Sequence, residues 1–172
     1  MVRTGAVVCF VLFLAVPALA QEDFPRIQTS MGYANVSLLG SRHSGFANET
    51  GFNLTPTWGL NNYMGIYSLG DGLTMISNFF GGKATYRAAR VAPYVQAGIG
   101  IGYFSQSTSQ GIFDYGTKFG TKFGGGVDVP ISESMAIKAE VSRMTFKFRT
   151  TPESGWLTGT NFSTGIVFTL AN

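Results

Sequence analysis

Residues 93–104 read PYVQAGIGIGYF, a run in which every second residue is apolar. One face of this run is apolar and consists of Val95, Ala97, Ile99, Ile101 and Tyr103. The other face is polar or small and consists of Tyr94, Gln96, Gly98, Gly100 and Gly102. A period of two is typical of a β-strand whose two faces meet different surroundings. Because similar runs restart about every twenty residues along the chain, the sequence predicts a fold built from strands.

The first twenty residues have the features of a secretory signal peptide. Arg3 supplies a positive charge, residues 6–16 form a short apolar core, and Ala18-Leu19-Ala20 has the small-x-small form of a cleavage site. We predict export through the inner membrane, cleavage before Gln21, and one mature domain over residues 21–172. The only cysteine, Cys9, lies within the signal, so the mature chain is expected to contain no disulfide.

The chain is poor in charge for a water-soluble protein. Charged residues make up 12% of the sequence, about half of the ~25% that is usual in soluble domains. Loss of Arg3 with the signal lowers the net charge from +3 to +2, which is too weak to indicate a nucleic-acid partner. No apolar run after residue 20 approaches the ~18 residues that a spanning helix needs. An exported, strand-rich chain of this composition predicts an outer surface in contact with hydrocarbon.

The alternating pattern divides the mature chain into eight strands, with no helix and no linker. The predicted strands cover residues 27–38, 49–59, 62–69, 74–87, 92–104, 116–129, 135–149 and 157–170. Each strand with its connection then takes about 19 residues, enough for the ~9–11 residues of a spanning strand. We therefore predict an all-β fold, an eight-stranded antiparallel up-and-down transmembrane β-barrel.

The connections between these strands are predicted to alternate in length. Short turns are expected at residues 60–62, 88–91 and 130–134, and longer polar loops at residues 40–48, 105–115 and 150–156, with 69–73 as a short exception. Outer-membrane barrels have short periplasmic turns and longer extracellular loops. Because the strand number is even, both chain ends are expected on the periplasmic side.

Aromatic residues gather near the ends of the predicted strands. They are Trp58, Tyr63, Tyr67, Phe79, Phe80, Tyr86, Tyr94, Tyr103, Phe104, Trp156 and Phe168. Aromatic rings favour the headgroup region of a bilayer. We interpret the set as two interfacial girdles, against the alternative of ordinary strand preference.

Charged residues within the strands are predicted to point into the barrel, because a lysine on the lipid face at the bilayer midplane costs about 2–4 kcal/mol. Neighbouring glycines make room for them, since the interior of an eight-stranded barrel is barely wide enough for side chains. The predicted inward set consists of Lys83, Arg87, Gln96, Lys118, Lys122, Asp128, Lys138 and Glu140.

Folding of the sixth and seventh strands about the turn at 130–134 is expected to bring Lys122 near Glu140 and Asp128 near Lys138. Buried charges need partners. Two interpretations stay open, an ionic gate across a narrow lumen and a static plug of salt bridges that fills it.

The alternation of the seventh strand breaks near Ser142. Beyond it Met144, Phe146 and Phe148 take the parity that Lys138 and Glu140 have before it. This predicts either a β-bulge that resets the register or a strand that continues beyond the membrane.

Three segments resemble the OmpA-like outer-membrane β-barrel superfamily of Gram-negative bacteria. They are residues 93–104, Gly124-Gly125-Gly126-Val127-Asp128, and Ser134-Met135-Ala136-Ile137-Lys138-Ala139-Glu140-Val141. Typical members carry a P-Y-x-x-x-G-x-G strand, a G-x-G-V-x-Y strand and an L-x-x-E-Y-R-Y strand. Glu140, Val141 and Arg143 fall at or near the E, Y and R of the last motif.

The resemblance implies a location in the outer membrane and contact with its lipid and lipopolysaccharide. It also implies insertion by the barrel assembly machinery, although the chain ends in Ala171-Asn172 in place of the usual terminal aromatic residue. Because the sequence ends with the last predicted strand, we expect no peptidoglycan-binding domain. The loops are expected to meet a partner whose identity stays open.

One candidate catalytic group comes from a second resemblance. Lipid A-modifying barrels place a histidine, a serine and an acid near the outer rim, and His43, Ser44 and Asp71 are the residues here that match those types. A solvated loop is the simpler interpretation of this group, and no metal or other cofactor is expected.

We predict a non-enzymatic protein with a structural or surface role, with or without a narrow gated solute path. The alternatives are a carrier of hydrophobic small molecules, a lipid A-modifying enzyme, and a soluble barrel of the lipocalin kind. The last would need a charged exterior, which the composition does not supply.

Overall fold

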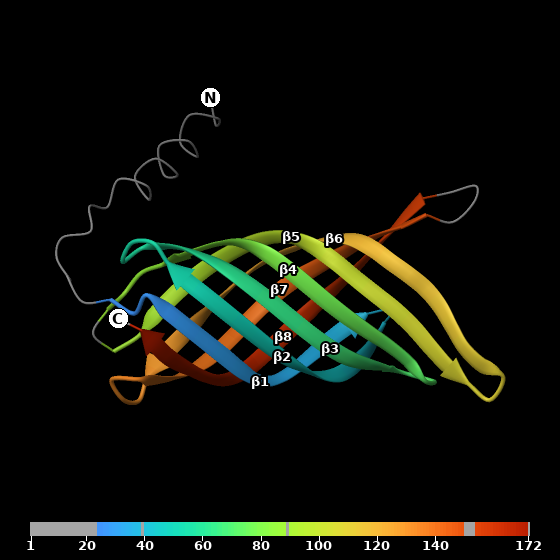
Figure 1. Cartoon of the computed structure of the whole chain (residues 1–172), viewed down its shortest axis with the longest axis horizontal. Coiled ribbons are helices and arrows are strands. Elements are labelled where there is room, and N and C mark those ends of the chain that lie inside the picture. Colours follow the sequence, from blue (N-terminus) through green and yellow to red (C-terminus); the bar gives the residue numbers. More distant parts are fainter. Residues whose placement is uncertain (1–23, 39, 89, 150–153, 172) are drawn as a thin grey trace, which may run out of the picture.

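Eight antiparallel strands close into one barrel, and each pairs with its neighbours in the sequence (Figure 1). The computed structural model describes residues 24–38, 40–88, 90–149 and 154–171. The predicted signal peptide lies outside the described residues. The strands are β1 (Ile27–Leu38), β2 (Ser41–Asn53), β3 (Trp58–Gly70), β4 (Leu73–Thr85), β5 (Ala92–Thr108), β6 (Gly111–Pro130), β7 (Met135–Arg149) and β8 (Ser154–Ala171). The predicted fold class is confirmed, and β1 and β7 have the predicted bounds.

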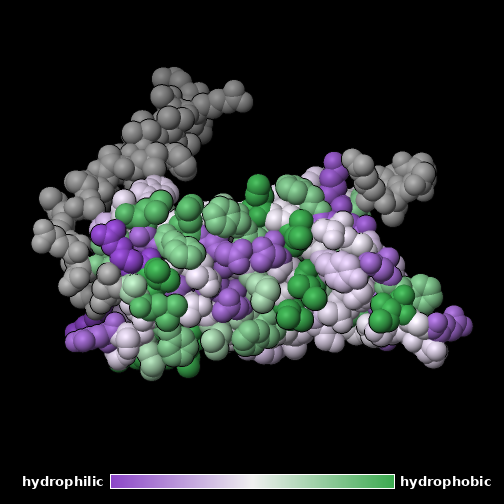
Figure 2. All heavy atoms as spheres, viewed as in Figure 1, coloured by the Kyte–Doolittle hydropathy of each residue, from purple (hydrophilic) through white to green (hydrophobic). Residues whose placement is uncertain are grey.

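Alternate residues of each strand face opposite sides of the wall. On β5, Val95 is 56% exposed whereas Gln96 is 4% exposed, as the period of two predicts. The outward face carries many large apolar side chains, such as Ile66, Phe123 and Val141. Apolar residues therefore cover much of the outer surface (Figure 2). Such a surface is stable in hydrocarbon and costly in water.

The two ends of the barrel differ in their connections. At one end, here called the terminal end, β1 begins and β8 ends, and residues 54–57, 86–91 and 131–134 join the strands. At the other end, the hairpin end, residues 71–72 and 109–110 form tight turns. β5 and β6 have 17 and 20 residues, whereas β2, β3 and β4 have 13 each. The β5–β6 hairpin therefore extends beyond the neighbouring wall (Figure 1).

Two predicted boundaries in the first half of the chain are wrong. Residues 41–48 of the predicted loop 40–48 belong to β2, which pairs with β1 from Leu38–Ser41 onward. The predicted turn at 60–62 lies inside β3, and the actual turn is at 54–57. There the Thr55 hydroxyl oxygen accepts a hydrogen bond from the Trp58 N–H at 2.8 Å, which satisfies the backbone before the strand begins.

The predicted loop 105–115 is also largely wrong, because β5 runs to Thr108 and β6 starts at Gly111. A register shift after Phe104 accommodates the extension. Of the predicted loop 150–156, residues 150–153 lie outside the described residues and the remainder belongs to β8. The short turns predicted at 88–91 and 130–134 are confirmed within the connections 86–91 and 131–134.

Of the two interpretations of the break in the alternation of the seventh strand, the β-bulge is wrong. β7 pairs with both neighbours without a register shift, and its even-numbered residues point inward from Lys138 to Phe146. Met144 and Phe146 are 0% exposed. The change of residue type therefore marks a change in the contents of the lumen, from charged to apolar, and no bulge.

The apolar core fills the half of the lumen nearer the hairpin end. Its members include Val36, Leu38, Tyr67, Leu69, Met75, Phe79, Phe104, Met144 and Phe146. Phe146 packs against Phe79 and Phe104, with ring centroids 5.8 Å and 5.4 Å away. Glycines opposite this ring leave it space, because a Cβ on Gly102 or Gly120 would lie 2.5 Å or 2.8 Å from a Phe146 ring carbon.

The interpretation of the aromatic residues as girdles is wrong for five members of the set, and for the others it stays a prediction. Trp58, Phe80, Tyr86 and Trp156 are exposed on the outside. Five others are buried inside the barrel, namely Tyr63, Tyr67, Phe79, Tyr94 and Phe104. Their strand parity points them inward, and the inward-facing glycines make room for their rings.

No helix among the described residues is long and apolar enough to span a membrane.

Candidate functional site inside the barrel

Six charged residues, five of them buried and Lys83 with a side chain 11% exposed, occupy the half of the lumen nearer the terminal end. They come from β2, β4, β6 and β7, and are Glu49, Lys83, Lys122, Asp128, Lys138 and Glu140. The three lysines and three carboxylates have opposite and equal formal charge. We call this set the lumen charge network. All except Glu49 belong to the inward set predicted from the sequence.

Glu140 is the central carboxylate of the network and is 1% exposed. Its Oε1 atom lies 2.6 Å from Lys122 Nζ, and its Oε2 atom lies 3.2 Å from Lys138 Nζ. Lys138 also lies 2.7 Å from Glu49 Oε2. Because Lys138 bridges β7 to β2 across the lumen, the network ties opposite walls of the barrel together.

Lys83 extends the network toward the terminal end. Its Nζ atom lies 3.5 Å from both Glu49 Oε1 and Asp128 Oδ2. Asp128 and Lys138 are register partners on β6 and β7, but the ion pairs of Lys138 go to Glu49 and Glu140. The charges thus form one continuous chain in the order Lys122, Glu140, Lys138, Glu49, Lys83 and Asp128.

Two tyrosines support the network from the side. Tyr94 donates a hydrogen bond of 2.9 Å to Glu140 Oε2, and its ring centre lies 3.8 Å from Lys83 Nζ. The ring centre of Tyr63 lies 4.2 Å from Lys122 Nζ. Ammonium groups at this distance from an aromatic face are attracted by its quadrupole. The lysines therefore have partners on several sides, as buried charges need.

A neutral hydrogen-bonded cluster joins the lumen charge network to the apolar core. The Tyr63 and Tyr67 hydroxyl oxygens lie 2.6 Å apart, and Tyr67 donates to Asn161 Oδ1 at 2.9 Å. Asn161 in turn donates to the hydroxyl of Ser142 at 3.3 Å. The interior polarity thus falls in steps along the barrel, from ions to hydroxyl and amide groups to hydrocarbon.

The other three predicted inward residues are not members of the lumen charge network. Gln96 is buried beside it and accepts a short hydrogen bond from the Asn61 side chain. Arg87 lies in the connection 86–91, where its Nε atom donates to the Pro56 carbonyl at 2.9 Å. Lys118 points inward nearer the hairpin end, with its Nζ atom 5.3 Å from the ring centre of Phe148.

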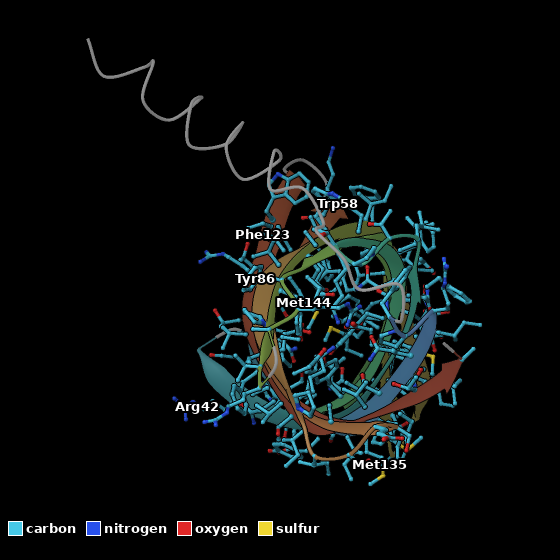
Figure 3. The ribbon with its side chains drawn as sticks, turned by 90° about the vertical axis from the view of Figure 1, so that its left-hand side faces the viewer. Arg42, Trp58, Tyr86, Phe123, Met135 and Met144 are labelled. Carbon is cyan, nitrogen blue, oxygen red and sulfur yellow. The ribbon has the colours of Figure 1, made fainter. Side chains whose placement is uncertain are left out.

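Two small cavities adjoin the lumen charge network. They have about 10 Å³ each and lie beside Glu49, Lys138 and Ser30, and this volume is roughly that needed for one water molecule. Toward the hairpin end the apolar core closes the interior, with Met144 at its centre (Figure 3). In the same view, along the barrel from the terminal end, Trp58 and Phe123 project outward.

The candidate catalytic residues do not come together. His43 and Ser44 are neighbours on β2, so their side chains point to opposite faces of the wall. Ser44 is exposed outside, where its hydroxyl oxygen lies 2.8 Å from that of Tyr33. Asp71 lies in the β3–β4 turn with a φ of 50°. Among the described residues no three metal-ligating side chains form a group.

Comparison with known proteins adds independent information on this architecture. Residues 6–169 match a family model described as "Outer membrane protein beta-barrel domain". No curated protein sequence matches the chain.

Several solved outer-membrane barrels have similar structures. Neisserial surface protein A is 14% identical, with 84% of this chain and 96% of that chain covered and a TM-score of 0.67. The N-terminal β-barrel domain of Pseudomonas aeruginosa OprF is 15% identical over 82% and 97%, with a TM-score of 0.54. Ail, the attachment invasion locus protein of Yersinia pestis, is 15% identical over 83% and 97%, with a TM-score of 0.52. Identities this low show a common fold alone.

Proposed function

The chain belongs to the family of outer membrane protein beta-barrel domains, and we propose that it acts as a closed, non-conducting barrel that anchors a surface structure in the outer membrane. The observation that carries this proposal is the filled lumen. Salt bridges occupy one half and packed apolar side chains the other. We further propose that the protein has no enzymatic activity, in line with the separation of His43 from Ser44.

Opening a path through this barrel would require two changes. Separating Lys122 from Glu140 leaves buried charges without partners, which is strongly unfavourable. Phe146 and Met144 would also have to leave a packed core, where even small changes of volume are costly. The lumen charge network therefore acts as a structural plug.

A gated solute path is the second candidate function. Lys138 contacts both Glu49 and Glu140, and Lys83 contacts both Glu49 and Asp128, so each of these two lysines has an alternative partner already in place. Exchange of these partners would let the two lysines move without leaving either of them unpaired. The apolar core argues against this function, because it would still block the lumen.

Solute uptake by proteoliposomes separates the two candidates. Liposomes that contain the refolded protein should swell in small sugars or amino acids no faster than protein-free liposomes. A carrier of hydrophobic compounds would give uptake of an apolar dye with the same slow sugar uptake. Swelling that depends on the amount of inserted protein would support the gated path and contradict the closed barrel.

The surface that we propose the barrel presents is the β5–β6 hairpin. Ile112 is 76% exposed near its tip, and Phe113 and Tyr115 are exposed beside it. Exposed apolar side chains that gather on an element beyond the membrane wall are typical of interaction sites. With both chain ends at the periplasmic side, this hairpin faces the cell exterior.

Selective labelling tests this orientation. The chain has one cysteine, Cys9, in the predicted signal, so an introduced cysteine has no background. Gln110→Cys at the tip of the β5–β6 hairpin should react with a membrane-impermeant maleimide on intact cells. Ser132→Cys in the connection 131–134 is the matched control and should react only after permeabilisation. Labelling with the opposite pattern would overturn the proposed surface.

The lipid partners follow from the charges on the outer wall. Arg143 and Lys147 are exposed on the outward face of β7, on the half nearer the hairpin end. Lys147 Nζ lies 5.8 Å from the ring centre of Trp156, an arrangement suited to a membrane interface. We propose that these cations bind phosphates of lipopolysaccharide. Insertion by the barrel assembly machinery, with the outward apolar face of β8 as its signal, is part of the same proposal.

A further inference from the structure

One side of the outer wall carries polar side chains within the apolar band. They lie on the outward faces of β1 to β4 and are Thr29, Asn48, Thr50, Asn62 and Asn78, here called the amide patch. On β2, β3 and β4 exposed apolar residues lie on both sides of the polar ones. Asn62 lies between Leu60 and Met64, and Asn78 lies between Ile76 and Phe80. The patch is therefore at the depth of the hydrocarbon and not at the headgroups.

Among the described residues, outward carboxamide side chains with exposed apolar residues on both sides occur on β2, β3 and β4 alone. On β6, at the opposite side, the outward positions hold Phe119, Thr121 and Phe123, and on β7 Val141. Figure 2 shows the face with β1 to β4, where hydrophilic side chains interrupt the apolar surface. The difference between the two sides indicates that the amide patch meets something other than lipid tails.

Hydrogen bonds within the patch satisfy only part of its capacity. Asn62 Nδ2 donates to Asn78 Oδ1 at 3.1 Å, and Asn48 Nδ2 donates to the Ser30 carbonyl at 3.0 Å. The Thr29 and Thr50 hydroxyl oxygens lie 3.3 Å apart. A carboxamide has two N–H donors and an oxygen that accepts twice. Donors and acceptors thus remain in a medium without water, where an additional polar partner is favourable.

The wall beside the patch is thin. Gly32 of β1 pairs with Gly165 of β8. Both face the lumen, and the two backbones are so near that a Cβ on either residue would collide with the other strand. One of the two small cavities lies at this thin place, between the outward Asn48 and Thr164 and the buried Glu49. The lumen charge network therefore comes near the outer surface here.

We propose that the amide patch is the contact surface between two copies of this chain in the outer membrane. Amides are both donors and acceptors, so the same patch on a second barrel is complementary to it. A two-fold axis through the patch lets each copy present the same residues to the other. The dimer also covers the thin wall at Gly32 and Gly165 and so separates the lumen charge network from lipid.

Cysteine cross-linking in native membranes tests the surface. Thr50→Cys lies in the patch on β2, and Phe123→Cys lies on β6, on the opposite wall, as the matched control. With a lipid-soluble oxidant, Thr50→Cys should give a species of twice the monomer mass, and Phe123→Cys should remain monomeric. Equal cross-linking of both variants, no cross-linking of either, or a product with a different protein from Thr50→Cys would each overturn the proposal.

A double substitution tests the role of the amides. Asn62→Leu/Asn78→Leu removes a hydrogen-bonded pair together and leaves no unpaired amide from that pair. The barrel should stay folded, shown by the slower migration of an unheated sample relative to a boiled one in SDS gels. In the Thr50→Cys background the cross-linked fraction should fall by about tenfold. An unchanged fraction in a folded variant would contradict a dimer held by these amides.

Discussion

Glu140 has three partners in the lumen charge network and around it, namely Lys122, Lys138 and the Tyr94 hydroxyl. These groups come from three strands. Strand parity directs each partner into the lumen. The carboxylate balances the positive charges of two buried ammonium groups. Loss of this side chain therefore acts on both lysines.

Glu140→Ala should lower the free energy of unfolding by about 3–5 kcal/mol, because it leaves Lys122 buried without its carboxylate. The midpoint of urea unfolding in lipid or detergent measures this change. Glu133→Ala, in the exposed connection 131–134, is the control and should leave the midpoint unchanged. Equal midpoints for both variants would remove Glu140 from a structural role.

Gly120 leaves space for the ring of Phe146. A Cβ on Gly120 would lie 2.8 Å from a ring carbon of Phe146. Gly120→Ala should therefore destabilise the barrel by about 1–3 kcal/mol through overpacking. Adding Phe146→Leu should recover part of this loss, so that the double variant is more stable than the sum of the single changes predicts. Gly82→Ala, where a Cβ meets open space, is the control.

A lack of this coupling between Gly120 and Phe146 in urea unfolding would show that the glycine serves strand curvature and not the ring. The sequence indicates that glycines line the inner face, but the break in the alternation of β7 left open to which side Phe146 points.

The alternation along the strands is sufficient to predict one further member of the lumen charge network, Glu49. Glu49 has the parity of Ala47, Gly51 and Asn53, which all point inward on β2. It was missed because the predicted second strand started at residue 49 and gave too little pattern before it. Its partner Lys138 is 89 residues away, and parity predicts the direction of a side chain but not which distant side chain it meets.

At the level of elements, the strands with a long apolar alternation were predicted closely and those without it were not. β5 and β7 carry clear patterns over most of their length. Residues 41–45 read SRHSG, which is typical of a loop, and these residues form strand because β1 offers them backbone partners. Local strand propensity is a weak predictor of structure where pairing with a neighbouring strand stabilises the segment.

In β3 the error is the opposite one, because residues that form strand were predicted as a turn. Asn61-Asn62 is a common turn sequence, yet Asn61 points into the lumen and Asn62 faces the membrane, each with a side-chain partner. The actual turn contains Thr55 and Pro56, which also favour turns. The pattern gave two candidates, and only the pairing of β2 with β3 decides between them.

The β5–β6 hairpin should be dispensable for folding. Deleting Gln106, Ser107, Ile112 and Phe113 removes two cross-strand pairs and keeps the parity and the turn. The urea midpoint should change little, because outside the hairpin these residues contact only Leu73 and the β3–β4 turn, where the Ser107 N–H donates to the Gly72 carbonyl. Leu38→Ala, a buried residue of the β1–β2 hairpin, should instead cost about 2–5 kcal/mol. A large loss of stability from the deletion would show that the hairpin contributes to the barrel.

In the whole molecule, two kinds of side chain fill the lumen, charged ones and apolar ones. The lumen charge network fills the terminal end and the apolar core fills the hairpin end, with Tyr63, Tyr67 and Asn161 between them. The sequence indicated a change along β7, where Met144 follows Glu140 at the same parity. The two layers of the plug, however, are formed by residues of several strands that are distant in sequence. The pattern along β7 alone could not predict them.

The closed lumen is the central claim, and single-channel recording in planar bilayers tests it most directly. Refolded protein whose insertion is verified should give no discrete openings, and Glu140→Ala should be equally silent because the apolar core still blocks the path. Discrete openings of the unaltered protein, with a conductance that Glu140→Ala changes, would contradict the plug and make the lumen charge network a gate.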